Sequence, residues 1–228
     1  MRAVLFGATG MIGQGVLREC LIAPEVEAVL SVARSPTGTT HPKLRELQPP
    51  DFVDFTAVEQ ELRGFDACFF CLGITSAGMS EADYRRVTHD IALAAGRTLA
   101  RLNPGMTFVF VSGAGADSTE RGRLMWARVK GQTENAILTL PFKRAVVFRP
   151  GIVLPMHGAA SKTKWVRVIY NITKPIWPVL FALFPRHVTT TERIGLAMLQ
   201  VARHGTPKSV LEMPDIIGLS NVGLRAEG

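Results

Sequence analysis

Cysteine is scarce in this sequence, and the shortage excludes one class of protein. The 228 residues include three cysteines. A small, odd number of cysteines does not suggest a disulfide framework and fits a reducing compartment. Cys68 and Cys71 form a C-x-x-C pattern. Positions three apart on a strand point to opposite faces, so we expect two buried apolar side chains rather than a redox pair.

Long uninterrupted apolar runs are also missing. The most apolar stretch, 165–184, contains Pro175 and Pro178 and carries the charges of Arg167 and Lys174. Two charges and two internal prolines argue against a membrane span in a stretch barely long enough to cross one. We expect this stretch to form a helical lid or a homodimer surface, with contact to a membrane surface as the alternative.

The chain has a net charge of +7 and a sequence pI near 9.8, but it lacks a continuous basic stripe interleaved with aromatic residues. A nucleic-acid partner is therefore not expected. The charge is enough to attract a phosphate-bearing cofactor or an anionic small-molecule substrate. Hydrophobic residues make up 47% and charged residues 20%, which is ordinary for a cytosolic enzyme. Because an apolar segment begins at Met1, we expect no signal peptide, and we predict a cytoplasmic location and no metal site.

The most informative feature that is present lies within the first thirteen residues. The apolar run 1–6 leads directly into Gly7-Ala8-Thr9-Gly10-Met11-Ile12-Gly13 and then into an amphipathic helix that ends near Leu21. A strand that turns through glycines into a helix leaves backbone N–H groups free for a pyrophosphate, and the positive end of the helix dipole favours its charge. This order predicts a dinucleotide-binding loop formed by Gly7 and Thr9 to Gly13.

Strands and helices continue to alternate beyond this unit. Expected strands are 27–33, 52–53, 66–72, 106–111 and 144–148, and expected helices are 56–62, 81–102 and 119–140. This order predicts an α/β fold, a Rossmann-type doubly wound parallel sheet that binds ligands at the carboxyl ends of its strands. We expect residues 1–150 to form the dinucleotide-binding domain and residues 151–228 a small C-terminal helical lobe for the substrate. A later helix is expected to start with a capping box of Thr189 and Glu192.

From Gly7 to about Leu219 the sequence resembles the short-chain dehydrogenase/reductase superfamily. It is most similar to the atypical and extended members, which are nucleotide-sugar epimerase-like proteins and Tat-interacting-protein-like oxidoreductases. The resemblance implies a nicotinamide dinucleotide as cofactor. Arg34 and Ser35, after the second strand, stand where NAD-preferring enzymes place an acid. An arginine there favours the 2′-phosphate of NADP, with NAD as the alternative cofactor. The alternative for Arg34 itself is a solvated surface arginine with no role in binding.

The resemblance also implies further cofactor contacts. Asp54, with Phe55, matches the adenine-contacting acid of the family, although an aspartate there can also be a turn residue or helix cap. Near the ribose and nicotinamide the matching segments are Cys71-Leu72-Gly73 and Arg149-Pro150-Gly151 with Ile152. His157 and Ser161 follow in the expected substrate loop.

The catalytic residues are where the sequence departs from the family. Ser112 matches the serine, and Lys130 matches the lysine of the Tyr-x-x-x-Lys pattern, but Trp126 occupies the tyrosine position. An indole N–H only donates a hydrogen bond and cannot exchange a proton near neutral pH. Tyr84 or Tyr170 would have to move in to replace the phenol. Lys130 either holds the ribose hydroxyls or is an ordinary helix lysine.

These observations lead to a first prediction and a rival. The first is an NADP-binding oxidoreductase or epimerase-like protein with an unusual catalytic centre. The rival is a catalytically silent dinucleotide-binding protein that senses redox state and acts through a protein partner. A true sugar-nucleotide epimerase is less favoured, because the short region after Gly151 leaves little room for a nucleotide-diphosphate pocket.

Overall fold

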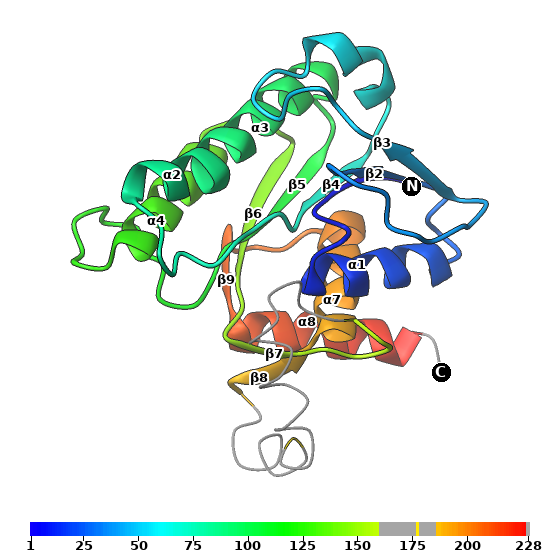
Figure 1. The fold of residues 1–228 in the computed structure, drawn as a ribbon. Helices are drawn as coiled ribbons and strands as arrows, with labels where there is room; N and C mark the ends of the chain where they lie inside the picture. Colours follow the sequence, from blue (N-terminus) through cyan, green and yellow to red (C-terminus); the bar gives the residue numbers. More distant parts are fainter. Residues whose placement is uncertain (160–176, 178–185, 227–228) are drawn as a thin grey trace.

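The structure, a computed structural model, describes residues 1–159, 177 and 186–226 and is built around one parallel sheet (Figure 1). Its seven strands follow the order β3-β2-β1-β4-β5-β6-β9, and every neighbouring pair runs parallel. The strands are β1 (Arg2–Phe6), β2 (Ala28–Val32), β3 (Leu44–Leu47), β4 (Ala67–Phe70), β5 (Thr107–Val111), β6 (Arg144–Arg149) and β9 (Val210–Glu212). The predicted doubly wound α/β fold is confirmed.

Helices cover both faces of the sheet (Figure 1). One face is packed by α1 (Met11–Ile22), α7 (Thr191–His204) and α8 (Met213–Ala226). The other is packed by the 3-10 helix Thr56–Leu62, α3 (Ile91–Leu102) and α4 (Met125–Leu138). The short helix α2 (Glu81–Arg85) runs through a π-helical turn, Arg86–Asp90, into α3.

The alternation of side chains along the strands divides the core into two layers. Phe6 and Phe70 face α3 and stack with ring centroids 5.1 Å apart, whereas Leu5 and Phe69 face α1. All four are fully buried, as the apolar sequence of a parallel sheet requires. Cys68 and Cys71 point to opposite layers, as predicted, but only Cys68 is fully buried and Cys71 is half-buried.

Two further strands form a small second sheet beyond the end of β6. β7 (Ile152–Leu154) pairs in parallel with β8 (Val188–Thr190), and β8 continues into α7. Apart from Trp177, the apolar stretch 165–184 lies outside the described residues, as do Ser161 and Tyr170. Its predicted role as lid, dimer surface or membrane contact therefore stays a prediction.

Three sequence predictions of local structure were wrong. The third strand is at Leu44–Leu47 and not at 52–53. It could not be recognised from the sequence, because Arg45 and Glu46 of this edge strand are exposed and leave no apolar pattern. The helix expected from 119 starts at Met125, since residues 117–122 form a turn around the Asp117 carboxylate.

The N-cap of α7 is also displaced by one residue. It is Thr190, whose hydroxyl accepts a hydrogen bond from the Arg193 N–H at 3.1 Å, and not Thr189, which is buried in β8. Strand β9 was not predicted at all, because it has only three residues.

Candidate functional site

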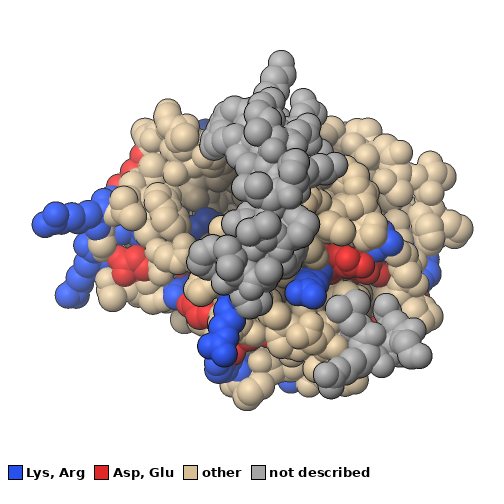
Figure 2. Space-filling model, turned by 90° about the horizontal axis from the view of Figure 1, so that it is seen from below, with Lys and Arg blue, Asp and Glu red and all other residues tan. Residues whose placement is uncertain are grey.

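The carboxyl ends of all seven parallel strands meet along one edge of the sheet. The chain builds outward through β2 and β3 on one side of β1 and through β4, β5, β6 and β9 on the other. Open α/β sheets bind ligands in the crevice at such a reversal, here between β1 and β4. Figure 2 shows the molecule from the side on which β7 and β8 lie, and acidic and basic residues are interspersed on that face.

The turn between β1 and α1 has the geometry of a phosphate-binding loop. Gly7 has a φ of 79°, and a Cβ on Gly13 would lie 2.0 Å from the Gly7 carbonyl oxygen, so both positions require glycine. A Cβ on Gly10 would meet only that oxygen, at 3.3 Å, and otherwise faces open space. No side chain caps α1, and its first turn holds no acidic residue. The positive end of the helix is therefore available to an anion.

The other predicted loop residues complete this turn. Thr9, Met11 and Ile12 are half-buried. The Thr9 carbonyl oxygen accepts a hydrogen bond from Gln14 Nε2 at 3.1 Å, which ties the loop to the first turn of α1. The loop is thus held in shape by its own backbone and by α1.

Arg34 and Ser35 lie at the end of β2 and are exposed. Within the described ranges, the Arg34 guanidinium forms no ion pair with a carboxylate. An acid does stand near this loop, since Glu46 of β3 accepts a hydrogen bond from the Thr37 N–H at 2.6 Å. One carboxylate oxygen of Glu46 is therefore hydrogen-bonded to the loop backbone and not to Arg34.

The two residues predicted to lie at an adenine have other contacts. Asp54 is exposed and accepts hydrogen bonds from the Thr56 hydroxyl and N–H, and the hydroxyl bond lowers the pKa of this carboxyl. Phe55 is buried in the core against Phe6. Asp54 therefore makes the turn that the sequence left open as an alternative.

The segment after β4 lies directly against the glycine loop. A Cβ on Gly7 would lie 2.6 Å from Leu72 N, so β1 and β4 approach each other as closely as backbone allows. Burial raises the pKa of the Cys71 thiol, which makes it unreactive as a nucleophile. Gly73 is exposed, with nothing near the position of a Cβ.

Ser112 directly follows β5, and the Lys130 side chain lies against its neighbours in the chain, Gly113 and Phe110. Ser112 is 93% buried, and its hydroxyl has no hydrogen-bond partner among the described residues. Lys130 Cε lies 3.9 Å from the position of a Cβ on Gly113, and its Nζ lies 5.9 Å from the centroid of the Phe110 ring. Burial lowers the pKa of Lys130 to about 8, and the charge of Glu134 opposes this change.

Trp126 lies one turn before Lys130 on α4, as the spacing requires. It is half-buried, and its Cη2 lies 3.4 Å from the position of a Cβ on Gly115. Tyr84 does not take its place: it is 2% exposed in α2, and burial raises the pKa of its phenol. Among the described residues, no tyrosine therefore replaces the missing phenol beside Lys130.

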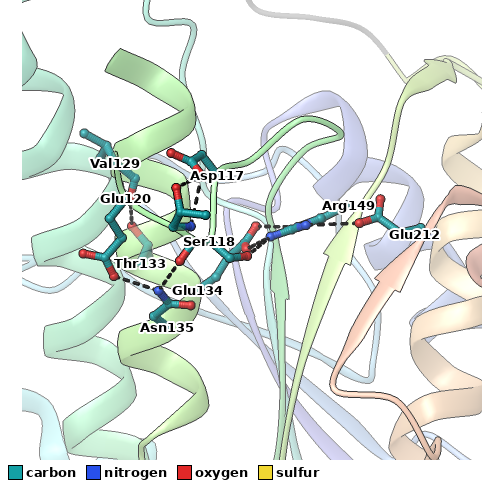
Figure 3. A network of polar contacts seen from close by, with 10 residues as sticks. Asp117, Ser118, Glu120, Val129, Thr133, Glu134, Asn135, Arg149 and Glu212 are labelled. Carbon is teal, nitrogen blue, oxygen red and sulfur yellow. Dashed lines mark hydrogen bonds and ion pairs between the residues drawn. The ribbon is translucent and has the colours of Figure 1, made fainter. Parts of the chain in front are cut away.

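Arg149 anchors a network of polar contacts that sequence reasoning missed (Figure 3). Its Nε donates to both Glu134 oxygens, at 3.1 and 3.2 Å, and its Nη2 also donates to Glu134. The same guanidinium donates to Ser118 at 2.5 Å and to Glu212 at 3.1 Å. Hydrogen bonds to Glu134 raise the pKa of Arg149 further. No signal in the sequence indicated these partners, because they meet only in the folded chain; the spacing of four places only Lys130 and Glu134 on one helix face.

The remaining predicted contacts follow Arg149. The Pro150 carbonyl oxygen accepts from the Ala114 N–H at 2.9 Å, which joins this turn to the loop after Ser112. Gly151 and Ile152 are exposed. In the substrate loop, His157 Nε2 lies 3.5 Å from Glu192 Oε1 at the start of α7.

A cleft of about 650 Å³ lies beside this edge, along α1. It shares Ala8 and Thr9 with the glycine loop and extends between the segments 37–41 and 156–159 to the start of α7. Within the part of the chain that the structure describes, no cluster of metal-binding side chains is present. No helix in that part is long and apolar enough to cross a membrane.

Solved structures with the same fold are short-chain dehydrogenase/reductase and epimerase proteins. A Francisella tularensis short chain dehydrogenase family protein is 14% identical, with a TM-score of 0.68, and the match covers 95% of this chain and 98% of that one. The Bordetella bronchiseptica enzyme WbmF, solved with NAD+, is 15% identical with a TM-score of 0.66, covering 98% and 77%. These likenesses establish the fold.

Sequence comparison finds FMP52 proteins among the relatives of this chain, although no family model matches it. Protein FMP52-1, mitochondrial, from Scheffersomyces stipitis is 30% identical over 156 residues, 68% of each chain. Protein fmp52-2, mitochondrial, from Aspergillus oryzae is 25% identical over 222 residues, 95% of this chain and 96% of the relative. Neither carries a Tat-interacting-protein name.

The names of these relatives contradict the cytoplasmic location predicted from the sequence. Relatives from Scheffersomyces stipitis, Aspergillus oryzae and Candida albicans are all named mitochondrial. Composition and cysteine content had suggested the cytosol, but they report only a reducing environment and do not specify an organelle. By its similarity to these relatives, the chain belongs to the FMP52 protein family.

Proposed function

We propose that this protein is an NADP-binding oxidoreductase of the short-chain type that acts on a small carbonyl or hydroxyl compound in mitochondria. The observation that carries the proposal is the buried Ser112 hydroxyl, which lacks a described partner and directly precedes Gly113, the residue against which the Lys130 side chain lies. An unsatisfied buried hydroxyl costs about 1–3 kcal/mol, a cost that a ligand oxygen would remove. The names of the relatives support the location.

The residues at the sheet edge fit a dinucleotide. The open space at Gly10 and the uncapped start of α1 suit a pyrophosphate, and Arg34 with Ser35 suits a 2′-phosphate. Lys130 would hold the ribose hydroxyls. When bound, the nicotinamide supplies a hydride donor or acceptor. Solved structures with this fold contain NAD+ or NADH, which supports a nicotinamide cofactor in general.

Two side chains of the proposed centre have defined tasks. The Ser112 hydroxyl donates a hydrogen bond to the substrate oxygen, where negative charge develops. The Lys130 ammonium holds the ribose hydroxyls and favours negative charge nearby. Neither supplies the general acid of the family, and the indole of Trp126 cannot exchange a proton. Slow turnover with intact dinucleotide binding is therefore expected.

A second candidate function rests on the same feature. Because Trp126 replaces the acid and Tyr84 is buried elsewhere, a dinucleotide sensor without turnover is also supported. It would report the redox state to a protein partner, as some atypical members of the short-chain dehydrogenase/reductase superfamily do. Measurable turnover by the unmodified protein with any carbonyl substrate would exclude this candidate.

The first test is cofactor preference. We expect NADPH to bind about ten- to a hundredfold more tightly than NADH, because a charge-assisted contact from Arg34 to the 2′-phosphate contributes roughly 1.5–3 kcal/mol. Calorimetric titration should show that Arg34→Ala removes most of this preference. Arg97→Ala, at an exposed arginine on α3, is the matched control. Equal affinity of the unmodified protein for both cofactors would contradict the assignment of NADP.

The second test addresses the glycine loop. Gly10→Ala should weaken dinucleotide binding at least about tenfold while leaving the melting temperature nearly unchanged, because the added methyl fills ligand space and touches little protein. Gly105→Ala is the control, since a Cβ there meets nothing within 4 Å and lies away from the glycine loop. Gly13→Ala should instead destabilise the fold. Unchanged affinity in Gly10→Ala would mean that the loop does not hold the phosphates.

A further inference from the structure

The network around Arg149 joins three segments of the chain that are distant in sequence. Glu134 belongs to α4, Ser118 to the loop after β5, and Glu212 to the end of β9, and all three accept hydrogen bonds from one guanidinium (Figure 3). Glu134 is only 1% exposed, so its carboxylate is shielded from water, and the ion pair with Arg149 offsets the free-energy cost of burying this charge. With bonds to both of its oxygens, Arg149 fixes where this buried charge stands.

Lys130 lies one helical turn before Glu134 on α4, and this spacing places both side chains on one face of the helix. The other charged groups that pack on α4 are engaged elsewhere. Glu81 of α2 pairs with Arg128 at 2.5 Å, and Arg85 donates to Gln132. Among the described charges, Glu134 is the one whose field favours the Lys130 ammonium.

We propose that Glu134 is a positioning residue: its buried carboxylate, held by Arg149, keeps Lys130 charged at the carboxyl end of β5. The proposal rests on the function proposed for Lys130, but its structural part can be tested without any cofactor. Without Glu134, burial alone would act on Lys130, and its pKa would fall further below about 8. Lys130 would then be neutral at the pH at which the unmodified protein carries the charge.

The test compares Glu134→Gln with Glu212→Gln. Each variant removes one carboxylate charge from Arg149, but only Glu134 stands one helical turn from Lys130 on α4, and Glu212 is half-exposed. The protein is labelled with 13Cε-lysine, the Lys130 signal is assigned with Lys130→Met, and its pKa is measured by NMR titration of the ligand-free protein. We expect a pKa near 8 in the unmodified protein, a value lower by about one pH unit or more in Glu134→Gln, and little change in Glu212→Gln.

Glu134→Asp keeps the negative charge, but its side chain is one methylene shorter, so the carboxylate lies closer to the helix backbone. It should lower the pKa of Lys130 less than Glu134→Gln does, and it keeps the test valid if the glutamine variant fails to fold. Equal shifts in Glu134→Gln and Glu212→Gln, or no shift in either glutamate-134 variant, would overturn the proposal.

Dinucleotide titrations separate this proposal from the proposed function. In the unmodified protein, NADPH affinity should fall as the pH rises through 8, and in Glu134→Gln this fall should begin at lower pH, with affinity restored at pH 6. If Lys130→Met binds NADPH as tightly as the unmodified protein at every pH, the assignment of Lys130 to the cofactor fails. The NMR titration would still decide whether Glu134 governs the charge of Lys130.

Discussion

Trp126→Tyr is expected to raise NADPH-dependent carbonyl reduction by about 10²–10⁴-fold, the usual contribution of a general acid or base. The new phenol would stand one turn from Lys130 on α4, with Ser112 at the adjacent end of β5. The Lys130 ammonium would lower the pKa of the phenol and let it exchange a proton near neutral pH. Loss of NADPH absorbance with a panel of aldehydes and ketones measures the gain.

Trp126→Phe is the matched control, since it removes the indole and adds an aromatic ring without a hydroxyl. An equal gain in both variants would mean that space, and not the acid, had limited turnover. No gain in Trp126→Tyr, combined with full activity in Ser112→Ala, would place the chemistry outside this part of the sheet edge.

The second large effect concerns stability. Lys130→Met should make the ligand-free protein more stable by about 2 kcal/mol at pH 7, while its dinucleotide binding falls. Burial lowers the pKa of Lys130 from its ordinary 10.5 to about 8, and each unit corresponds to about 1.4 kcal/mol. The smaller expected value allows for solvent around a half-buried side chain. Methionine matches the apolar stem and removes the buried charge.

The pH dependence of this effect has a definite sign. The unfolded chain binds the lysine proton more tightly than the folded one, so the penalty is fully present below about pH 8. It disappears as the pH rises through 10.5, where both states are neutral. Denaturant unfolding of Lys130→Met and the unmodified protein should therefore differ most at neutral pH and converge above pH 10. A constant difference across this range, or the same behaviour in Lys143→Met at an exposed lysine, would contradict the explanation.

The parts of the fold that could be predicted from the sequence are those with local causes. The turn from Gly7 to Gly13 needs glycine because its own backbone crowds it, and this requirement is visible in thirteen residues. The buried strands β4 and β5 are apolar on both faces and were recognised for that reason. The edge strand β3 has no such pattern, because Arg45 and Glu46 face solvent.

In the candidate site too, features with local causes were predictable and tertiary contacts were not. The spacing of Trp126 and Lys130 follows from helical geometry and was predictable. The partners of Arg149 were not, because Ser118, Glu134 and Glu212 meet only through the tertiary fold. For Phe55, a match to a family position did not reveal that the side chain faces the core, where it is buried.

The two parts of the site are made at different times during synthesis. Translation runs toward the C-terminal side, so β1 and the glycine loop are made before Glu212 of β9. Until β9 joins β6, the guanidinium of Arg149 lacks its third carboxylate oxygen, and β6 remains an open edge of the sheet. The glycine loop is therefore made before the contacts of Arg149 can be completed.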